Sequence, residues 1–193
     1  MSDINENSND DEYHLLGGDY YAPKLCNILK GREFPNAIEV CCGVGLIGKE
    51  LKKNKIVNHI WYSDIVDMSN YCDNFILSDA LESINCKFDL IVCSPPWYNV
   101  RNSPKGLEQR GRILWQDMDW EFHQRFYQKL PSILKTDGVA LVTGAYESRK
   151  PNEWLDMCKL QIVNVYDFTE PRGSVEYPEN YIIEWARLGT TNV

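Results

Sequence analysis

The chain has 193 residues, a net charge of −8, 44% hydrophobic residues and 25% charged residues. These values are typical of one globular domain, and no apolar run approaches the ~20 residues that a membrane-spanning helix needs. The negative charge argues against strong nonspecific binding to nucleic acid, because phosphates repel an acidic surface.

The cysteines and histidines do not form a metal-binding pattern. The seven cysteines contain no Cys-x-x-Cys pair, and the three histidines are scattered along the chain. Several cysteines fall in apolar, strand-like runs, where cysteine behaves as a small hydrophobic residue. We therefore expect reduced thiols, a cytoplasmic location, no metal site and no membrane association.

The first 12 residues differ in composition from the rest. They carry five acidic side chains and no basic one, and they are rich in Asn and Ser. Such a segment buries too little apolar surface to fold, so we expect residues 1–12 to be a disordered acidic tail. Residues 13–193 are expected to form a single domain.

Hydrophobic periodicity and turn signals predict four helices and seven strands. In chain order these are a helix over residues 23–30, a strand over 37–42, a helix over 46–53, strands over 57–63, 75–77 and 90–93, a helix over 118–134, a strand over 139–143, a helix over 154–160, and strands over 161–168 and 181–188. A turn at residues 136–138 is predicted to end the long helix.

This order of elements indicates the α/β class. Strands that alternate with helices predict a doubly wound, mostly parallel seven-stranded sheet of the Rossmann-like kind, and the last two strands predict an antiparallel C-terminal hairpin. In such sheets the ligand lies beyond the carboxyl ends of the strands. A glycine-rich turn, two aspartates and a pair of prolines all fall at those ends.

The glycine-rich turn is Gly43-x-Gly45-x-x-Gly48, followed at a suitable distance by Asp64. It matches the dinucleotide fingerprint, in which glycines let a ligand approach the backbone and an acidic residue holds ribose hydroxyls. The ordinary alternative is a strand-to-helix turn that needs glycine only for packing. A phosphate-binding loop is disfavoured, because Glu50 stands where that loop has Ser or Thr.

The second informative feature is Ser94-Pro95-Pro96-Trp97, directly after an apolar strand. Each proline fixes φ and removes an N–H, so the segment neither continues the sheet nor starts a helix. It forms an extended rim with free carbonyl groups, a hydroxyl before it and an indole after it. Acceptors beside a stacking surface suit a planar nitrogen group.

Together these features resemble a known family. Residues 38–48 are similar to motif I of the class I S-adenosylmethionine-dependent methyltransferases, and residues 94–97 resemble motif IV of their amino-methylating branches. The similarity covers most of residues 18–145 and is greatest to the "methyltransferase small" group. It implies S-adenosyl-L-methionine as the cofactor, bound by Tyr21, Glu39, Cys41, Gly43, Gly45, Asp64, Asp79 and Ser94. In that family Glu39 would lie near the methionine end, Asp64 would bind the ribose and Asp79 would reach the adenine.

Two positions depart from the family pattern. The family usually has glycine where this chain has Cys41, whose Cβ would press toward the amino-acid end of the cofactor. Glutamine and N6-adenine methyltransferases more often have Asn or Asp at the position of Ser94, and serine there resembles cytosine-N4 methyltransferases. The chain has no separate target-recognition domain, so their substrate is not carried over.

The expected chemistry is methyl transfer to nitrogen. The Ser94 hydroxyl and the Pro95 carbonyl are the predicted acceptors for the N–H groups of the substrate, and Trp97 is expected to hold its plane. These three residues are the predicted catalytic group. Ordinary core packing is the alternative for Trp97.

Further substrate contacts are predicted at Pro96, Trp97, Tyr98, Arg101 and Trp115. Arg101 opens a basic segment over residues 101–112, which is either a lid over the substrate or a solvated loop. Trp115 opens an aromatic and acidic segment over residues 115–120, which either binds an amine or caps the following helix.

The leading hypothesis is an N-methyltransferase acting on a protein glutamine amide or a small-molecule nitrogen. The alternative acceptor is an exocyclic amine of RNA or DNA. A non-catalytic cofactor-binding partner subunit is an alternative of another class, and a nicotinamide oxidoreductase is the least favoured. The sequence predicts neither the methyl acceptor nor the oligomeric state.

Overall fold

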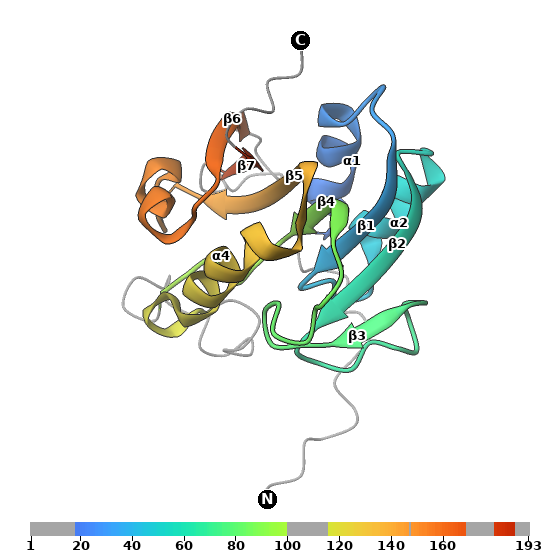
Figure 1. Cartoon of the computed structure of the whole chain (residues 1–193), viewed down its shortest axis with the longest axis horizontal. Helices are drawn as coiled ribbons and strands as arrows, with labels where there is room; N and C mark the ends of the chain where they lie inside the picture. Colours follow the sequence, from blue (N-terminus) through green and yellow to red (C-terminus); the bar gives the residue numbers. More distant parts are fainter. Residues whose placement is uncertain (1–17, 100–115, 147, 169–179, 188–193) are drawn as a thin grey trace, which may run out of the picture.

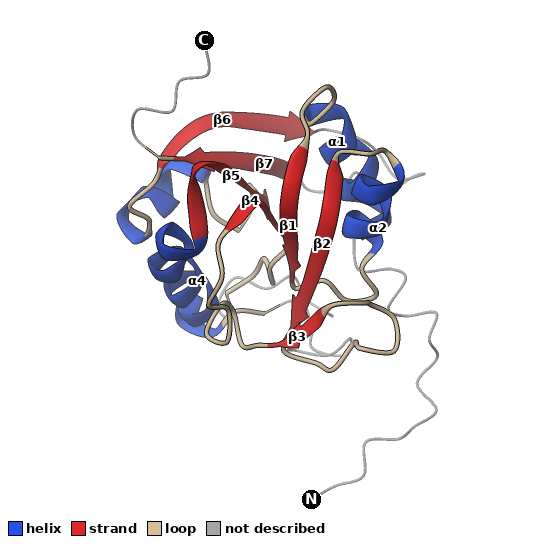
Figure 2. Ribbon diagram, turned by 45° about the vertical axis from the view of Figure 1, so that its right-hand side comes forward, coloured by secondary structure: helices blue, strands red, loops and turns tan. Residues whose placement is uncertain are grey.

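The computed structural model describes residues 18–99, 116–146, 148–168 and 180–187. These residues form a sheet with helices on both faces (Figure 1, Figure 2). The elements are α1 Gly18–Ile28, β1 Phe34–Val40, α2 Leu46–Lys53, β2 Val57–Asp64, β3 Phe75–Leu77, β4 Phe88–Cys93, the 3-10 helix η4 Met118–Trp120, α4 Glu121–Ile133, β5 Leu134–Ala145, the 3-10 helix η5 Pro151–Met157, β6 Gln161–Phe168 and β7 Asn180–Ala186.

The sheet has seven strands in the order β3-β2-β1-β4-β5-β7-β6. The first five of these are parallel neighbours, while β7 runs antiparallel to both β5 and β6. The predicted α/β class, the mostly parallel seven-stranded sheet and the C-terminal antiparallel hairpin are therefore confirmed. The strand order reverses between β1 and β4, which is where open α/β sheets bind ligands.

The two faces of the sheet have separate hydrophobic cores. Helices α1 and α2 pack on one face, around Tyr21, Leu25 and Leu51, while α4 and η5 cover the other, around Phe126 and Trp185 (Figure 2). In α2, Ile47 and Leu51 are buried and the lysines are exposed, so its amphipathic pattern sets which side faces the sheet.

The first helix begins earlier than predicted. It spans Gly18–Ile28 instead of residues 23–30, so Pro23 lies inside the helix and not in its first turn. Proline lacks the N–H that would bond to the carbonyl four residues earlier, which disfavours this position. Tyr21 and Leu25 are buried against the sheet, and their packing outweighs the proline penalty.

The turn predicted at residues 136–138 is wrong. These residues belong to β5, where they form an irregular part of the strand. Phe88 pairs with Leu134, and Leu90 pairs with Val139. Between these pairs β4 advances by two residues and β5 by five, so the extra residues form a bulge. A turn signal in the sequence therefore appears as a distortion within a long strand.

Two predicted helices also have different bounds. The helix predicted over residues 118–134 begins as η4 and continues as α4, because the backbone of Asp119 and Trp120 is left-handed, with φ of 49° and 63°. The helix predicted over 154–160 is instead the 3-10 helix η5, which has Pro151 in its first turn.

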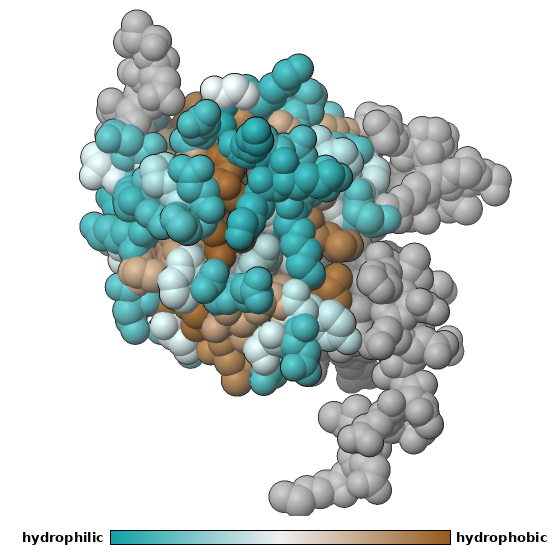
Figure 3. Space-filling view, turned by 90° about the vertical axis from the view of Figure 1, so that its right-hand side faces the viewer, coloured by the Kyte–Doolittle hydropathy of each residue, from teal (hydrophilic) through white to brown (hydrophobic). Residues whose placement is uncertain are grey.

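Helices do not connect β2 to β3 or β3 to β4 in the described structure, and this leaves one end of the sheet sparsely covered. Viewed from this side, the surface is mainly hydrophilic with hydrophobic side chains visible between polar ones (Figure 3). Trp61 and Leu77 on β2 and β3 are exposed.

Among the described residues, no helix has both the length and the apolar character needed to cross a membrane.

Candidate active site

A cavity of about 270 Å³ lies at the carboxyl ends of β1 and β4, where the strand order reverses. Its volume is close to the lower end of the range for small-molecule sites, which is about 300–1,000 Å³. The predicted site residues that line it are Glu39, Cys41, Gly43, Asp64, Asp79, Ser94, Pro95, Pro96 and Trp97. Signals that are up to 58 positions apart in the sequence therefore meet in one cavity.

The other predicted site residues are Tyr21, Gly45, Tyr98, Arg101 and Trp115. Tyr21 and Tyr98 are buried and do not form the cavity wall. Tyr21 instead supports the wall, since its ring packs edge-to-face on Trp97 with 5.5 Å between the ring centroids. Arg101 and Trp115 lie outside the described residues, as do the tail over 1–12 and the basic segment over 101–112.

The glycines of the turn have different roles. Gly43 has a φ of +48°, and a Cβ added there would meet no atom within 4 Å, so the turn leaves open space beside it. Gly45 has a φ of +76°, and a Cβ there would lie 2.7 Å from Cys72 Sγ. Gly43 thus leaves room for a ligand, whereas Gly45 is required by packing at the start of α2.

Asp64 holds the turn in place from the end of β2. One carboxylate oxygen accepts a hydrogen bond from the backbone N–H of Gly43 at 2.9 Å, and the other accepts one from Val66 N–H at 3.1 Å. Because each carboxylate oxygen has a second acceptor site, Asp64 retains the capacity to bind hydroxyl groups of a ligand.

Cys41, the departure from the family pattern, has a φ of 55°. This left-handed region favours glycine and costs a non-glycine residue roughly 1–2 kcal/mol. The residue lines the cavity. Backbone strain of this kind is typical of functional sites, where the surrounding structure maintains it.

Glu39 is an acidic group in a nearly dry environment. It lines the cavity, it is 2% exposed, and its Oε2 accepts a hydrogen bond from Gly48 N–H at 2.7 Å. Burial raises the pKa of Glu39 to about 8, against the lowering effect of that hydrogen bond. A strongly shifted titratable group in a cavity is a candidate for function.

The proline rim is tied to the neighbouring strand by a chain of hydrogen bonds. Trp97 Nε1–H donates to Thr143 Oγ1 at 3.2 Å, and the Thr143 hydroxyl lies 3.2 Å from Ser94 Oγ. Ser148 Oγ donates to the backbone carbonyl of Trp97. The indole ring is therefore held by its polar edge, and Ser94 is held at the cavity wall.

Asp79 lines the cavity but its carboxylate is paired. Arg125 Nη1 lies 2.7 Å from one oxygen, and Arg125 Nη2 lies 3.0 Å from the other. Nη1 also donates to Glu82 Oε1 at 2.9 Å, and these bonds raise the pKa of Arg125.

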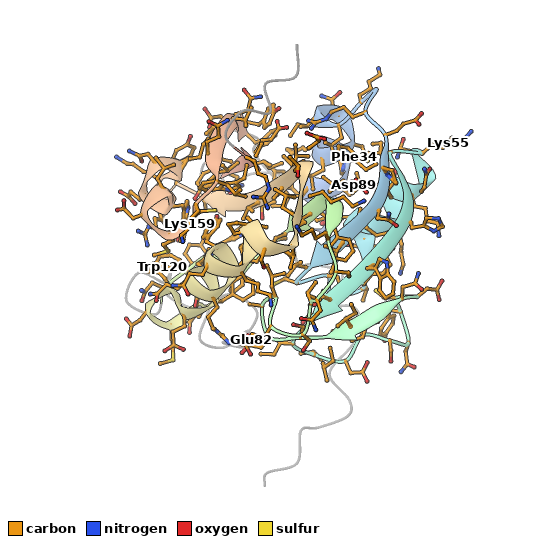
Figure 4. The ribbon with its side chains drawn as sticks, viewed as in Figure 1. Phe34, Lys55, Glu82, Asp89, Trp120 and Lys159 are labelled. Carbon is orange, nitrogen blue, oxygen red and sulfur yellow. The ribbon has the colours of Figure 1, made fainter. Side chains whose placement is uncertain are left out.

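Figure 4 labels Glu82 near the carboxyl ends of the strands, whereas Asp89 and Phe34 lie toward their amino ends.

Asp117 is a buried carboxylate at the cavity that the sequence did not single out as a site residue. It accepts hydrogen bonds from the backbone N–H groups of Phe122 and His123, and its Oδ2 lies 2.6 Å from His123 Nδ1. Burial lowers the pKa of His123. Asp117 therefore caps α4, as the helix-cap alternative for residues 115–120 predicts.

Described residues that flank positions 100–115 are joined to each other beside the cavity. Tyr98 and Gln116 form a parallel β-bridge, and Asp117 N–H donates to the carbonyl of Tyr98 at 2.8 Å. Gln116 itself lines the cavity. Among the described residues, no group of three or more His, Cys, Asp or Glu side chains is arranged to hold a metal ion.

The chain is similar in structure to several solved methyltransferases. TrmN from Thermus thermophilus matches with a TM-score of 0.63 and 14% identity over 92% of this chain, which spans 52% of TrmN. The N-methyltransferase NodS from Bradyrhizobium japonicum WM9, in complex with S-adenosyl-L-homocysteine, matches with a TM-score of 0.61 and 13% identity over 94% of both chains. The chain has the class I S-adenosylmethionine-dependent methyltransferase fold.

Further neighbours share this methyltransferase fold. A ribosomal protein L11 methylase from Lactobacillus delbrueckii subsp. bulgaricus matches with a TM-score of 0.57 and 16% identity, over 87% of this chain and 80% of the methylase. No protein-family model matches the chain, and no curated protein matches its sequence. The similarity therefore concerns the fold, and the chemistry has to be argued from the site.

Three residues of the site lie outside the sequence motifs: Thr143, Arg125 and Asp117. Thr143 follows the apolar core of β5, at the same edge of the sheet as Ser94. A polar residue at the carboxyl end of a buried strand beside the motif strand is a signal that sequence inspection can use. Arg125 carries no such signal, because its partners are set by the docking of α4. For Asp117 the signal is the helix-cap alternative for residues 115–120, because it binds N–H groups at the start of α4.

Proposed function

We propose that this chain is an S-adenosylmethionine-dependent N-methyltransferase that acts on a planar nitrogen, in a protein glutamine amide or in a small molecule. One observation carries the proposal: Gly43, Asp64 and the 94–97 rim line a single cavity at the point where the strand order reverses. The fold of the methyltransferase neighbours supports the same reaction class.

The cavity residues suit this cofactor. The open space beside Gly43 admits a ligand close to the backbone, and the Asp64 carboxylate has acceptor sites left for ribose hydroxyls. Glu39 and Cys41 would lie near the amino-acid end, and Asp79 near the adenine. When bound, S-adenosylmethionine supplies an electrophilic methyl group on a positively charged sulfur.

The chain of hydrogen bonds fixes which groups donate and which accept around the Ser94 hydroxyl. An indole N–H only donates, so Thr143 Oγ1 accepts from Trp97 and gives its own proton to Ser94 Oγ. Among the described residues the Ser94 hydroxyl has no other partner. It is left with one proton to donate and one lone pair to accept.

This arrangement favours a methyl-accepting group in which the nitrogen lies beside an atom that accepts a hydrogen bond. A carboxamide offers an N–H to the Pro95 carbonyl and an oxygen to the Ser94 hydroxyl. Conjugation makes such a nitrogen a poor nucleophile, and acceptors on its N–H groups favour the charge that develops during transfer. The rim would thus orient the nitrogen lone pair toward the methyl group.

Two other functions are kept as alternatives. Methylation of an exocyclic amine of RNA or DNA is favoured by four basic residues in the 101–112 segment and disfavoured by the net charge of −8. A non-catalytic cofactor-binding subunit is motivated by Cys41, which replaces the usual glycine at a left-handed position.

Calorimetry with S-adenosylmethionine and S-adenosyl-L-homocysteine tests the proposal first. Absence of binding at millimolar concentrations of both excludes it. Transfer of a labelled methyl group to fractionated peptides, small molecules and RNA then identifies the acceptor class, and steep salt dependence favours nucleic acid.

A pair of serine variants tests the role of the rim. Ser94→Ala is expected to lower the rate of transfer much more than the affinity for the cofactor, because the hydroxyl serves mainly the methyl acceptor. Ser132→Ala, on the exposed side of α4, is the matched control and is expected to change neither. Unchanged transfer by Ser94→Ala contradicts this role of the hydroxyl, whereas cofactor binding without any transfer by the unmodified protein favours the non-catalytic alternative.

A further inference from the structure

Two cysteine thiols share one hydrogen-bond acceptor in the glycine turn. Cys42 Sγ donates to the backbone carbonyl of Gly43 with a sulfur–oxygen distance of 3.3 Å, and Cys72 Sγ lies 3.8 Å from the same oxygen. The two residues are 30 positions apart in the sequence, so the fold and not the local chain brings their sulfurs together.

Both thiols belong to segments that the fold holds close. Cys42 follows β1 at the start of the turn, and Cys72 lies in the connection from β2 to β3, where its N–H donates to the carbonyl of Met68. A Cβ on Gly45 would lie 2.7 Å from Cys72 Sγ. The glycine at position 45 therefore leaves the space that the Cys72 sulfur occupies.

Both thiols are buried, but Cys42 is reachable from the cavity. Cys42 is 6% exposed and Cys72 is 3% exposed, so bulky thiol reagents have little access from the surface. Cys42 also lines the cavity at the strand ends. A small oxidant that enters this cavity can reach the pair at Cys42, and a molecule that fills the cavity would shield Cys42.

The environment makes one thiol more reactive than the other. The interaction between the two neighbouring thiols lowers the pKa of Cys72 and raises that of Cys42, whose proton is donated to the Gly43 carbonyl. Burial also raises the pKa of Cys42. Since the thiolate is the nucleophile, Cys72 is the attacking sulfur and Cys42 the resolving one.

We propose that Cys42 and Cys72 are a modification site: hydrogen peroxide converts them into a reversible disulfide, and this bond weakens cofactor binding at the glycine turn. The Cys72 thiolate attacks a peroxide oxygen, the O–O bond breaks, hydroxide leaves and a sulfenic acid forms. The Cys42 thiol then attacks the sulfenic sulfur, the S–S bond forms and water leaves. Overall, two thiols and one peroxide give a disulfide and two water molecules.

The disulfide changes the turn that lines the cavity. A bond of about 2.05 Å between the sulfurs removes both S–H donors from the Gly43 carbonyl. The Gly43 N–H, which donates to Asp64, lies in the same turn. We expect the affinity for S-adenosyl-L-homocysteine to fall about tenfold, the effect of losing one or two hydrogen bonds.

The chemical test needs no knowledge of the substrate. Fully reduced protein is treated with stoichiometric hydrogen peroxide, the remaining thiols are blocked with N-ethylmaleimide, and peptides are mapped by mass spectrometry without reduction. A Cys42–Cys72 cross-link that dithiothreitol reverses is the expected result. Exclusive linkage of other cysteines, such as Cys41 with Cys93, or unmodified thiols overturn the proposal.

Variants separate the pair from accessible cysteines. Cys72→Ser is expected to abolish the cross-link, whereas Cys86→Ser, which removes an exposed thiol, is expected to leave it unchanged. Mapping of the unmodified protein decides the same question if Cys72→Ser fails to fold. Peroxide added after S-adenosyl-L-homocysteine is expected to produce several-fold less cross-link, because the ligand shields Cys42.

The effect on the cofactor rests on the proposed function and is measured separately. Calorimetry compares S-adenosyl-L-homocysteine binding to reduced, oxidised and re-reduced protein. Reversible weakening of about tenfold supports the proposal, and equal affinities with the cross-link present overturn its second half. Failure of the reduced protein to bind both S-adenosylmethionine and S-adenosyl-L-homocysteine refutes the methyltransferase proposal. The cross-link map still tests the thiol pair in that case.

Discussion

The buried carboxyl group of Glu39 leads to a measurable dependence of stability on pH. Burial raises the pKa of Glu39 from 4.5 to about 8 in the folded protein. The folded state therefore holds a proton between these values that the unfolded chain has released. The stabilising contribution of the protonated group is complete below pH 4.5 and is lost as the pH rises through about 8.

The magnitude follows from the two pKa values. A shift from 4.5 to about 8 corresponds to about 5 kcal/mol between the limits, since each pH unit is worth about 1.4 kcal/mol. As the pH rises from 5 to 7, loss of this contribution should lower the free energy of unfolding by about 2.5 kcal/mol. Solvent screening is small, because Glu39 is 2% exposed.

Urea unfolding of the unmodified protein and Glu39→Gln at pH 5, 6 and 7 tests this prediction. The substitution removes the titration and keeps an oxygen for Gly48 N–H. From pH 5 to pH 7, the free energy of unfolding of the unmodified protein should therefore fall by about 2.5 kcal/mol more than that of the variant. The control is Glu50→Gln on α2, because a hydrogen bond from Lys53 lowers the pKa of Glu50 and places its titration below this pH range. Parallel curves for the unmodified protein and Glu39→Gln would refute the reasoning.

Three further predictions concern other residues of the site. Thr143→Val should leave S-adenosyl-L-homocysteine binding intact and reduce the rate of methyl transfer about 5–20-fold, because the Ser94 hydroxyl loses its donor; Thr143→Ser should restore the rate. Gly45→Ala should destabilise the fold by about 2–4 kcal/mol, against about 1 kcal/mol for Gly31→Ala, in urea titrations. Both glycines have positive φ, but only a Cβ at Gly45 meets neighbouring atoms. Asp117→Asn should lower the free energy of unfolding by about 1–3 kcal/mol, because the amide cannot replace both carboxylate oxygens as acceptors for the N–H groups at the start of α4.

These predictions have clear contrary outcomes. Equal rates for Thr143→Val and the unmodified protein would show that the hydroxyl chain does not act on transfer. Similar losses of stability at Gly45 and Gly31 would mean that backbone conformation alone accounts for the effect. A fully stable Asp117→Asn would contradict the assignment of Asp117 as the cap of α4.

The motifs predicted part of the cavity wall, because each is a local signal with a local cause. Glycine at positions 43 and 45 supplies positive φ, and the prolines at 95 and 96 end β4. Parallel strands present their carboxyl ends at one edge, so these short segments converge once the strand order is right. The same local signals failed at residues 136–138, where pairing with β4 retained a turn sequence inside β5.

The sequence by itself determined the class of fold, the glycine turn and the proline rim, because these depend on φ preferences and on hydrophobic periodicity along neighbouring residues. Only the tertiary structure decided which groups act on one another. Ser94 and Thr143 lie 49 positions apart, Asp79 and Arg125 lie 46 apart, and Cys42 and Cys72 meet at one carbonyl. Such pairings arise from the register of strands and the docking of helices, which residue type and spacing do not encode.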